Sequence, residues 1–421
     1  MKRSREVARA GRRGGDGVAE SAYAWVRLGA ALLLSTIGGV GMWSSVVALP
    51  AVQAEFGVAR AGASFPYTLT MIGFGLGGIL MGRLSDRFGI IVPVMLGSVA
   101  MAVGHVAAGS AATLWQYTLA QGLLVGVGSA ATFGPLVADT SMWFHRRRGL
   151  AVAIVASGNY VAGAVWAPAV QHFIATDGWR HTWFGIAGVC LATMLPLALV
   201  LRRRPPAHEA SRPGAVAAAG ATTGLGISPT ALQTLLIISG VSCCVAMSMP
   251  QVHMVAYCSD LGYGAARGAQ MLSLMLGCGI VSRLAFGAIS DRIGGLRTLL
   301  VGAGLQGLSL LLFLPFDGLV SLYFISALFG LFQGGIVPSY AIIVREYFSP
   351  TEAGARVGSV LMATLLGMAL GGWMSGAIFD FAGSYKAAFA NGILWNLVTL
   401  SIAGWLLRRH LQRAGATTVL V

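Results

Sequence analysis

Arg283 is a permanently charged side chain inside a long apolar stretch, AQMLSLMLGCGIVSRLAFGAISDRIGG. If this stretch is a helix that ends near Asp291, the arginine lies about 12 Å from that end, at ~1.5 Å per residue. The half-thickness of a bilayer's hydrocarbon core is about 15 Å, so the guanidinium would sit near the middle of a membrane. Charges at that depth face a bundle interior or a wet cavity. No Asp or Glu lies at comparable depth in a predicted span, so we expect an anionic substrate to supply the counter-charge.

The elements that must hold this arginine are membrane helices. Hydrophobic residues make up 56% of the 421 residues and charged residues only 10%, whereas soluble proteins carry about 25% charged residues. The 59 glycines allow close helix packing in lipid. The predicted fold is an all-α membrane protein with twelve transmembrane helices. The predicted spans are 27–49, 64–83, 90–109, 113–137, 149–172, 182–201, 229–256, 266–287, 297–315, 318–344, 354–379 and 386–407.

The net charge of +14 is distributed as in a membrane protein rather than a nucleic-acid-binding protein. Arginines cluster on alternate connections between the spans, whereas the opposite connections carry few basic residues. This pattern places the basic loops in the cytoplasm and predicts that both termini are cytoplasmic. The basic connections hold Arg83, Arg87, Arg146, Arg147, Arg148, Arg202, Arg203, Arg204, Arg292, Arg297, Arg345, Arg356, Arg408 and Arg409, against Arg60, Arg180, Arg267 and Lys386 on the opposite side.

The longest polar break divides the spans six and six. It is RRRPPAHEASRPGAVAAAGATTG, a Pro-, Gly- and Arg-rich segment typical of a flexible linker. We therefore predict two six-helix bundles joined by a cytoplasmic linker and flanked by cytoplasmic tails. The predicted boundaries are 1–24 for the basic N-terminal tail, 25–201 for the first bundle, 202–228 for the linker, 229–408 for the second bundle and 409–421 for the C-terminal tail.

The two halves share a sequence motif that follows the second span of each. GRLSDRFG and GAISDRIG both fit G-x-x-x-D-R-x-G. Its leading glycine allows a neighbouring helix to approach, its Asp-Arg pair lies where the helix leaves the membrane, and its closing glycine permits a tight turn. An internal repeat with a substrate site between the halves is the architecture of major facilitator transporters, whose gating motif this pattern resembles. The gating residues would be Gly82, Asp86, Arg87, Gly287, Asp291 and Arg292.

A second motif narrows the resemblance to a branch of that superfamily. MWFHRRRGLAVAIVASGNYVAG, which enters the fifth span, resembles the monocarboxylate porters, and MPQVHMVAYCSDLGYG resembles their bacterial members, relatives of oxalate/formate antiporters. Arg283 matches the arginine of the eighth helix that binds the substrate carboxylate in that branch. A guanidinium suits this role because its planar fork of donors meets a carboxylate bidentately.

The chain departs from that branch at three positions. Animal members carry an aspartate one turn before the arginine, where Gly279 stands here, and a lysine in the first helix, near Met42 and Trp43. Oxalate/formate exchangers carry a lysine in the eleventh helix, which has none here. One central cation fits a monocarboxylate better than a dicarboxylate. The missing aspartate argues against proton coupling by the animal mechanism.

Five further residues are candidates for the substrate site. Asn159 and Tyr160 form a polar pair about three turns into the fifth span, which is costly unless it faces a cavity or bonds across helices. Tyr340 and Gln333 lie in the tenth span, where branch members often place a substrate-facing aromatic residue. Phe133 follows a Gly-rich run in the fourth span. Ordinary helix packing is the competing interpretation for each.

Three titratable side chains are candidates for proton coupling. His105 and His253 fall near the outer ends of their spans, where hydrogen bonding at the interface is the competing role. Asp139 lies at the inner end of the fourth span and could pair with Arg146 or Arg147 or act in the inner gate. The cysteines form no C-x-x-C pair and fit a packing role better than a disulfide or metal role.

These observations and the resemblance predict a secondary transporter of a small monocarboxylate such as lactate or pyruvate, in a bacterial inner membrane. It would work by alternating access between the two halves, with proton symport as the coupling that is usual in that family. Organic-anion exchange of the oxalate/formate type and efflux of a drug or metabolite remain open. The sequence offers no gathered nucleophile, base, metal spacing or phosphate loop, so we expect no enzyme activity and no cofactor or metal. The expected partners are the substrate, protons and membrane lipid, with no nucleic acid, and the protein is expected to be a monomer.

Overall fold

The computed structural model describes residues 21–144, 146–203 and 225–418, almost all of them helical. Eleven helical segments in this part of the chain are long and apolar enough to cross a membrane. One of them, Arg148–Val200, turns at Gly178, whose φ of 81° is left-handed, and it therefore contains two spans. The described chain thus has the twelve spans that the sequence predicts.

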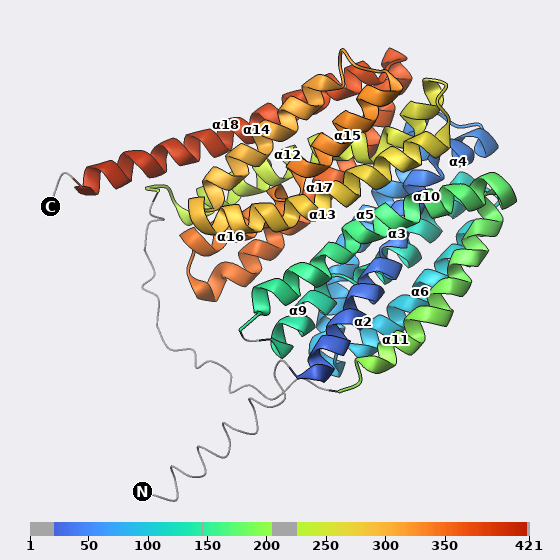
Figure 1. The fold of residues 1–421 in the computed structure, drawn as a ribbon, viewed down its shortest axis with the longest axis horizontal. Coiled ribbons are helices and arrows are strands. Elements are labelled where there is room, and N and C mark those ends of the chain that lie inside the picture. The colour runs from blue at the N-terminus through green and yellow to red at the C-terminus, as the bar shows by residue number, and fades with distance from the viewer. Residues whose placement is uncertain (1–20, 145, 204–224, 419–421) are drawn as a thin grey trace, which may run out of the picture.

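The first six spans run from α2 to α11 (Figure 1). Several of them are built from more than one helical piece, and the fourth breaks at Phe133 (φ −122°, ψ −82°). The pieces are α2 (Ala22–Gly38), α3 (Val40–Val47), α4 (Leu49–Phe56), α5 (Arg60–Phe88), α6 (Ile91–Gly109), α7 (Leu114–Leu119), η1 (Ala120–Gly126), α8 (Val127–Ala130), α9 (Gly134–Trp143), α10 (Arg148–Val189), η2 (Cys190–Met194) and α11 (Leu195–Val200).

The second six spans run from α12 to α18 and are more regular. The helix that opens this half has a capped start, because the Ser228 side chain accepts a hydrogen bond from the Ala231 N–H and Pro229 occupies the first turn. The elements are α12 (Pro229–Asp260), α13 (Ala265–Ile293), α14 (Gly295–Leu312), α15 (Leu319–Gln333), α16 (Ile336–Tyr347), α17 (Pro350–Ala382) and α18 (Tyr385–Thr418).

The repeated motif forms the same turn in both halves. Its closing glycines, Gly89 and Gly294, have φ values of 82° and 80° and ψ values of 167° and 166°. Each donates its N–H to the carbonyl of a serine four residues earlier, Ser85 or Ser290, over 2.8 and 2.9 Å. Side chains rarely adopt this φ, so glycine is required at both positions.

Two ends of the bundle can be distinguished. We call the end where α2 and α12 begin and α11 ends the linker end, and the end where α5 begins and α12 ends the far end. Figure 1 shows α10 of the first half beside α13 of the second, converging toward the far end and diverging toward the linker end. The seams α5–α17 and α10–α13 carry most of the contact between the halves.

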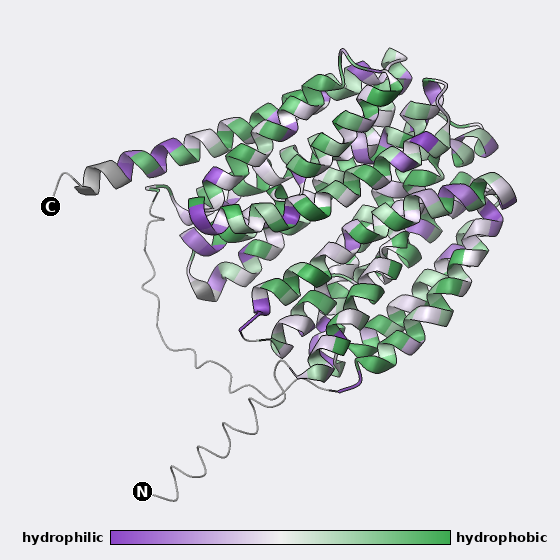
Figure 2. Cartoon of the chain, viewed as in Figure 1, coloured by the Kyte–Doolittle hydropathy of each residue, from purple (hydrophilic) through white to green (hydrophobic). Residues whose placement is uncertain are grey.

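The outer surface of the bundle is apolar. Figure 2 shows hydrophobic residues over nearly the full length of the helices. Large side chains such as Phe381 (96% exposed), Phe324 (64%) and Leu394 (64%) point away from the protein. Such a surface is stable when lipid surrounds it.

The predicted boundaries of the tails, the linker and the last span can be compared with the structure only in part. α18 continues as a helix to Thr418, well past the predicted end of the last span at 407. Most of the predicted N-terminal tail and linker, 1–20 and 204–224, lies outside the described residues. The division into the predicted domain ranges stays a prediction.

Candidate substrate site

Arg283 lies on α13 and reaches across to the first half of the protein. Its Nη1 donates to the backbone carbonyl of Ala156 on α10 over 2.7 Å. Its guanidinium carbon lies 4.6 Å from the centre of the Tyr160 ring, a cation–π distance. The arginine therefore links α13 of the second half to α10 of the first half.

The guanidinium is not neutralised by the surrounding chain. None of the ion pairs in the described part of the chain includes Arg283. Its Nε is buried and has no hydrogen-bond partner. A guanidinium has five N–H donors, and a buried donor left without a partner costs about 1–3 kcal/mol. The arrangement is suited to an acceptor with two oxygens.

Gly279 explains how the ring of Tyr160 reaches this arginine. A Cβ added at Gly279 would lie 2.6 Å from two carbons of the Tyr160 ring. Real Cβ contacts are essentially never that short, so any side chain at 279 would displace the ring. The position that carries an aspartate in animal monocarboxylate porters is thus occupied here by an aromatic ring from the opposite half.

Asn159 and Phe133 line a small cavity in the first half. The cavity lies next to the stretch of α10 whose Ala156 carbonyl accepts from Arg283. The cavity has a volume of about 10 Å³, near the lower limit of the space that can hold one water molecule. Asn159 Oδ1 and Ser35 Oγ are buried there without partners. Ser35 is only 2% exposed. The remaining lining residues are Gly39, Met42, Phe74, Ser129 and Thr132.

Tyr340 and Gln333 lie inside the second half rather than on an open wall. Both side chains are fully buried. The Tyr340 hydroxyl is hydrogen-bonded to Ser239 Oγ at 2.9 Å, and Gln333 Oε1 accepts from the Gln251 amide at 2.8 Å. Both side chains lie among packing contacts, although the Gln333 Nε2 is buried without a hydrogen-bond partner, and their role in substrate binding stays a prediction.

Asp139 has a partner that the sequence analysis missed. Its carboxylate accepts hydrogen bonds from Arg27 on α2, with 2.7 Å between Nη2 and Oδ2. The same arginine donates to the carbonyl of Leu201 at the end of α11 over 2.8 Å. Both charged side chains are at most 5% exposed. Arg27 is a charged residue at the start of an apolar run, and this position is the sequence signal that could have identified it as a partner of a buried acid.

The two candidate histidines have different surroundings. His105 on α6 is buried within the first half, and its Nδ1 lies 2.8 Å from the Met101 carbonyl of its own helix. His253 on α12 is also buried, but its ring joins three helices: Nδ1 lies 3.0 Å from the Tyr385 hydroxyl on α18, and Nε2 lies 2.8 Å from the Gly372 carbonyl on α17. Of the two, only His253 is linked to the other half, through the Tyr385 hydroxyl that Arg60 of the first half also binds.

The far end holds a charged cluster that the sequence analysis did not assemble. Arg60 of the first half donates to both oxygens of Asp260 over 2.9 and 3.0 Å and to the Tyr385 hydroxyl over 3.0 Å. The Asp380 carboxylate accepts from the backbone N–H groups of Arg60 and Ala61, each at 2.8 Å. These charges stand at the ends of different spans, so only the fold shows that they meet.

The α5–α17 seam is closed at the far end and at mid-depth. The Thr68 hydroxyl donates to the Ala369 carbonyl over 2.8 Å. A Cβ at Gly75 would lie 2.8 Å from the sulfur of Met362. At Gly82, two turns closer to the linker end, an added Cβ meets no described atom within 4 Å.

The α10–α13 seam follows the same course. It is tight at Gly163, where an added Cβ would lie 2.1 Å from the Leu276 side chain, and at the Arg283 hydrogen bond to Ala156. At Gly287 an added Cβ meets no described atom within 4 Å. Both leading glycines of the repeated motif are therefore open, and the neighbouring helix expected against them is absent because the halves diverge at the linker end.

The Asp-Arg pairs of the motif are exposed in this state. Asp86, Arg87, Asp291 and Arg292 are all solvent-accessible, and none forms an ion pair with a described residue. Asp86 and Arg87 line a cavity of about 600 Å³ at the linker end, together with Asp139 and the end of α11. Their gating role stays a prediction.

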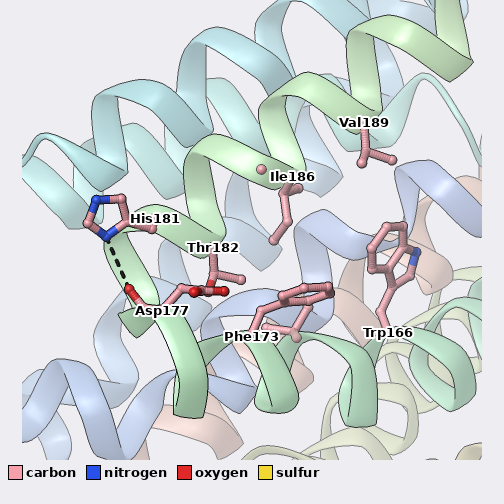
Figure 3. Close-up of a pocket in the computed structure, with 9 residues that line it drawn as sticks. Trp166, Phe173, Asp177, His181, Thr182, Ile186 and Val189 are labelled. Atoms are coloured by element: carbon pink, nitrogen blue, oxygen red, sulfur yellow. Dashed lines mark hydrogen bonds between the residues drawn. The ribbon is translucent and has the colours of Figure 1, made fainter.

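A cavity of about 610 Å³ lies away from the seam. It lies in the angle between the two limbs of α10, the parts of the helix before and after the turn at Gly178. Figure 3 shows apolar side chains such as Trp166, Phe173 and Ile186 around it, with Asp177 and His181 at one edge. The His181 ring is bonded to the backbone carbonyl of Asp177 over 3.1 Å. Because it lies between limbs of the first half, this cavity is separate from the site at Arg283.

The chain belongs to the major facilitator superfamily. The model of that family matches residues 31–326 and 283–418. Among solved structures, a mutant of the nucleoside transporter NupG superposes with a TM-score of 0.68 at 16% identity, over 93% of this chain and 99% of that one. A bacterial homolog of the human lysosomal transporter Spinster, inward-facing and unoccupied, gives 0.68 at 14% identity, over 93% and 96%. The predicted twelve-helix fold is confirmed.

Within the family, the chain is similar to monocarboxylate transporters. Monocarboxylate transporter 13 of Bos taurus is 29% identical over 314 residues, covering 73% of this chain and 71% of that protein. Monocarboxylate transporter 11 of Mus musculus is 28% identical over 388 residues, covering 89% and 85%. The chain is therefore a multi-pass membrane transporter of the major facilitator superfamily that is similar to monocarboxylate transporters, and not an enzyme.

Proposed function

We propose that this protein carries a small monocarboxylate of the lactate or pyruvate class across a membrane, with Arg283 as the ligand of the carboxylate. The observation that carries the proposal is an arginine at the seam between the halves that has no acidic partner in the described chain and a buried Nε without an acceptor. A carboxylate would supply two acceptors and the missing negative charge. The similarity to monocarboxylate transporters supports the same class of substrate.

The rest of the site would recognise the body of the acid. Tyr160 covers one face of the guanidinium, and its ring offers an apolar surface to a short aliphatic tail. Asn159 and Ser35 offer buried oxygens to a hydroxyl or a water molecule beside it. Phe133, which packs against Phe74 at 6.1 Å between ring centres, completes the wall of that cavity.

The proposed transport cycle is alternating access between the two halves. Arg283 bridges the halves through its bond to Ala156, so a carboxylate that binds the guanidinium acts at a contact between the halves. Substrate binding and the relative position of the halves are thereby coupled. The open glycines at the linker end and the closed seams at the far end support a state that is open toward the linker end.

We propose that the linker end faces the cytoplasm of a bacterial inner membrane, with both termini inside. The alternate basic connections support this orientation. Proton symport is the simplest coupling. Organic-anion exchange is the second candidate, favoured by the absence of a carboxylate next to Arg283, where Gly279 stands. One chain is sufficient for either mode, because both halves and the site between them belong to it. We therefore propose that the protein works as a monomer.

The test is uptake of labelled lactate and pyruvate into proteoliposomes. An inward proton gradient should accelerate uptake if transport is symport, whereas a preloaded acid should accelerate it without a gradient if transport is exchange. Unlabelled monocarboxylates should compete and lipophilic cations should not. Uptake that is inhibited by the cations and insensitive to every acid would instead support drug efflux and overturn the proposal.

A further inference from the structure

The far end is closed by a hydrogen-bonded chain that crosses from one half to the other, which we call the far-end latch. It consists of Arg60 from α5, Asp260 and His253 from α12, Asp380 from α17 and Tyr385 from α18. Arg60 is 6% exposed and His253 is fully buried. Every connection from Arg60 to a partner side chain joins the first half to the second.

Asp380 ties the latch to the backbone of the opposite half. The residue that precedes α5, Ala59, has no side chain able to cap the helix. Asp380 supplies the cap from α17, with its two oxygens each accepting one backbone N–H at 2.8 Å. A carboxylate at a helix N-terminus also interacts favourably with the helix dipole. Separation of the halves at this end would uncap α5.

The hydrogen bonds of the latch place a proton on His253 Nε2 and favour an unprotonated Nδ1. The Gly372 carbonyl can only accept, so Nε2 carries a proton and donates it over 2.8 Å. The Tyr385 oxygen accepts from Arg60 Nη1 over 3.0 Å, and its own proton is free to donate to His253 Nδ1 at 3.0 Å. With a neutral imidazole whose Nδ1 accepts, the Tyr385 proton and both ring nitrogens of His253 all have partners, so the closed latch favours this state.

The charged groups around His253 reinforce this preference for a neutral ring. Both oxygens of Asp260 are occupied by Arg60, and both oxygens of Asp380 are occupied by the start of α5. The Tyr257 ring, from the same helix as His253, packs edge-on against Tyr385. Arg60 is the cation that the hydrogen bonds place nearest to the imidazole, because both groups bind the Tyr385 hydroxyl. A second positive charge on the ring would therefore face a like charge.

We propose that His253 is a proton-binding site that controls the far-end latch. A proton on Nδ1 takes the acceptor away from the Tyr385 hydroxyl and sets an imidazolium against Arg60. The arginine is then released from Tyr385, and the far end opens. By linkage, opening of the far end in turn favours binding of the proton. The inference rests on the alternating access of the proposed function, but it does not depend on which substrate is carried.

The experiment measures the opening of the far end without any substrate. Spin labels are placed at Ala54→Cys on α4 and Ala266→Cys on α13, two exposed positions on opposite halves. The purified full-length protein in nanodiscs is followed by electron–electron distance measurement from pH 8 to pH 4. The ratio of open to closed populations should rise as pH falls, by up to about tenfold per pH unit for one linked proton. The chain without the added cysteines gives the labelling background.

Two variants place that response on His253. In His253→Gln the side chain cannot take up a proton, so the distances should no longer depend on pH. His105→Gln removes the buried histidine of the first half and should leave the pH response intact. An unchanged pH response in His253→Gln, or no response in the parent protein, overturns the proposal.

A third variant keeps the test independent of the folding of His253→Gln. Tyr385→Phe removes the hydroxyl that links Arg60 to His253 and retains the ring. The far end should then be open in a larger fraction of molecules already at pH 8. A Tyr385→Phe protein with the parent distances at every pH contradicts the latch. Because no substrate is present, the result is separate from the uptake experiments on the proposed function.

Discussion

At the scale of single residues, the account depends on Arg283 and on what surrounds its guanidinium. The guanidinium bonds one carbonyl, stacks on one ring and has a buried Nε without an acceptor. The depth of this residue and the lack of a nearby acidic residue could be predicted from the sequence. The contacts with Ala156 and Tyr160 could not, because they depend on how two helices far apart in the chain are packed.

Gly279 provides a prediction at this scale. In Gly279→Ala the new methyl would lie 2.6 Å from the Tyr160 ring, which must move away from the guanidinium. We expect the affinity for the transported acid to fall by roughly tenfold, equivalent to about 1.4 kcal/mol. The measurement is the half-saturating concentration in proteoliposome uptake.

The matched control is Gly277→Ala on the same helix, where an added Cβ meets nothing within 4 Å. That variant should transport like the parent protein. Equal half-saturating concentrations for both variants would show that the position of the Tyr160 ring does not matter for the site.

At the scale of elements, the repeated motif shows what a sequence pattern can and cannot predict. Both closing glycines adopt the left-handed turn that the pattern predicts. The leading glycines are open, because helix approach at that position depends on the state of the whole transporter. The pairing of Asp139 with Arg27 was missed for a similar reason, since it joins α9 to α2 across 112 residues of chain.

The buried pair yields a prediction about stability. Asp139→Asn leaves the Arg27 charge inside the first half with no counter-charge from Asp139, and breaking such pairs costs about 3–5 kcal/mol. The melting temperature of the detergent-solubilised protein should therefore fall clearly. Glu352→Gln, which breaks the exposed pair with Arg356, should have little effect, because exposed pairs contribute about 0–1 kcal/mol. Similar losses in both variants would contradict the structural role of the Arg27 pair.

At the scale of the whole molecule, the two ends of the seam between the halves differ. The far-end latch and the tight glycine contacts hold the halves together on one side, and the exposed Asp-Arg pairs stand apart on the other. The twelve spans and their six-and-six division follow from hydropathy and the repeat. The closed end could not be predicted, because its members lie at the ends of separate spans and each resembles an ordinary interfacial residue.

The central claim is that Arg283 binds a carboxylate, and the most direct measurement is the thermal stability of the purified protein with and without a panel of short monocarboxylates. A ligand at one hundred times its dissociation constant stabilises the folded state by about 2.7 kcal/mol. The account predicts that at least one acid raises the melting temperature of the parent protein. Arg283→Lys should weaken this stabilisation and Arg283→Gln should abolish it, while both variants stay folded. Undiminished stabilisation by the same acid in Arg283→Gln would contradict the account.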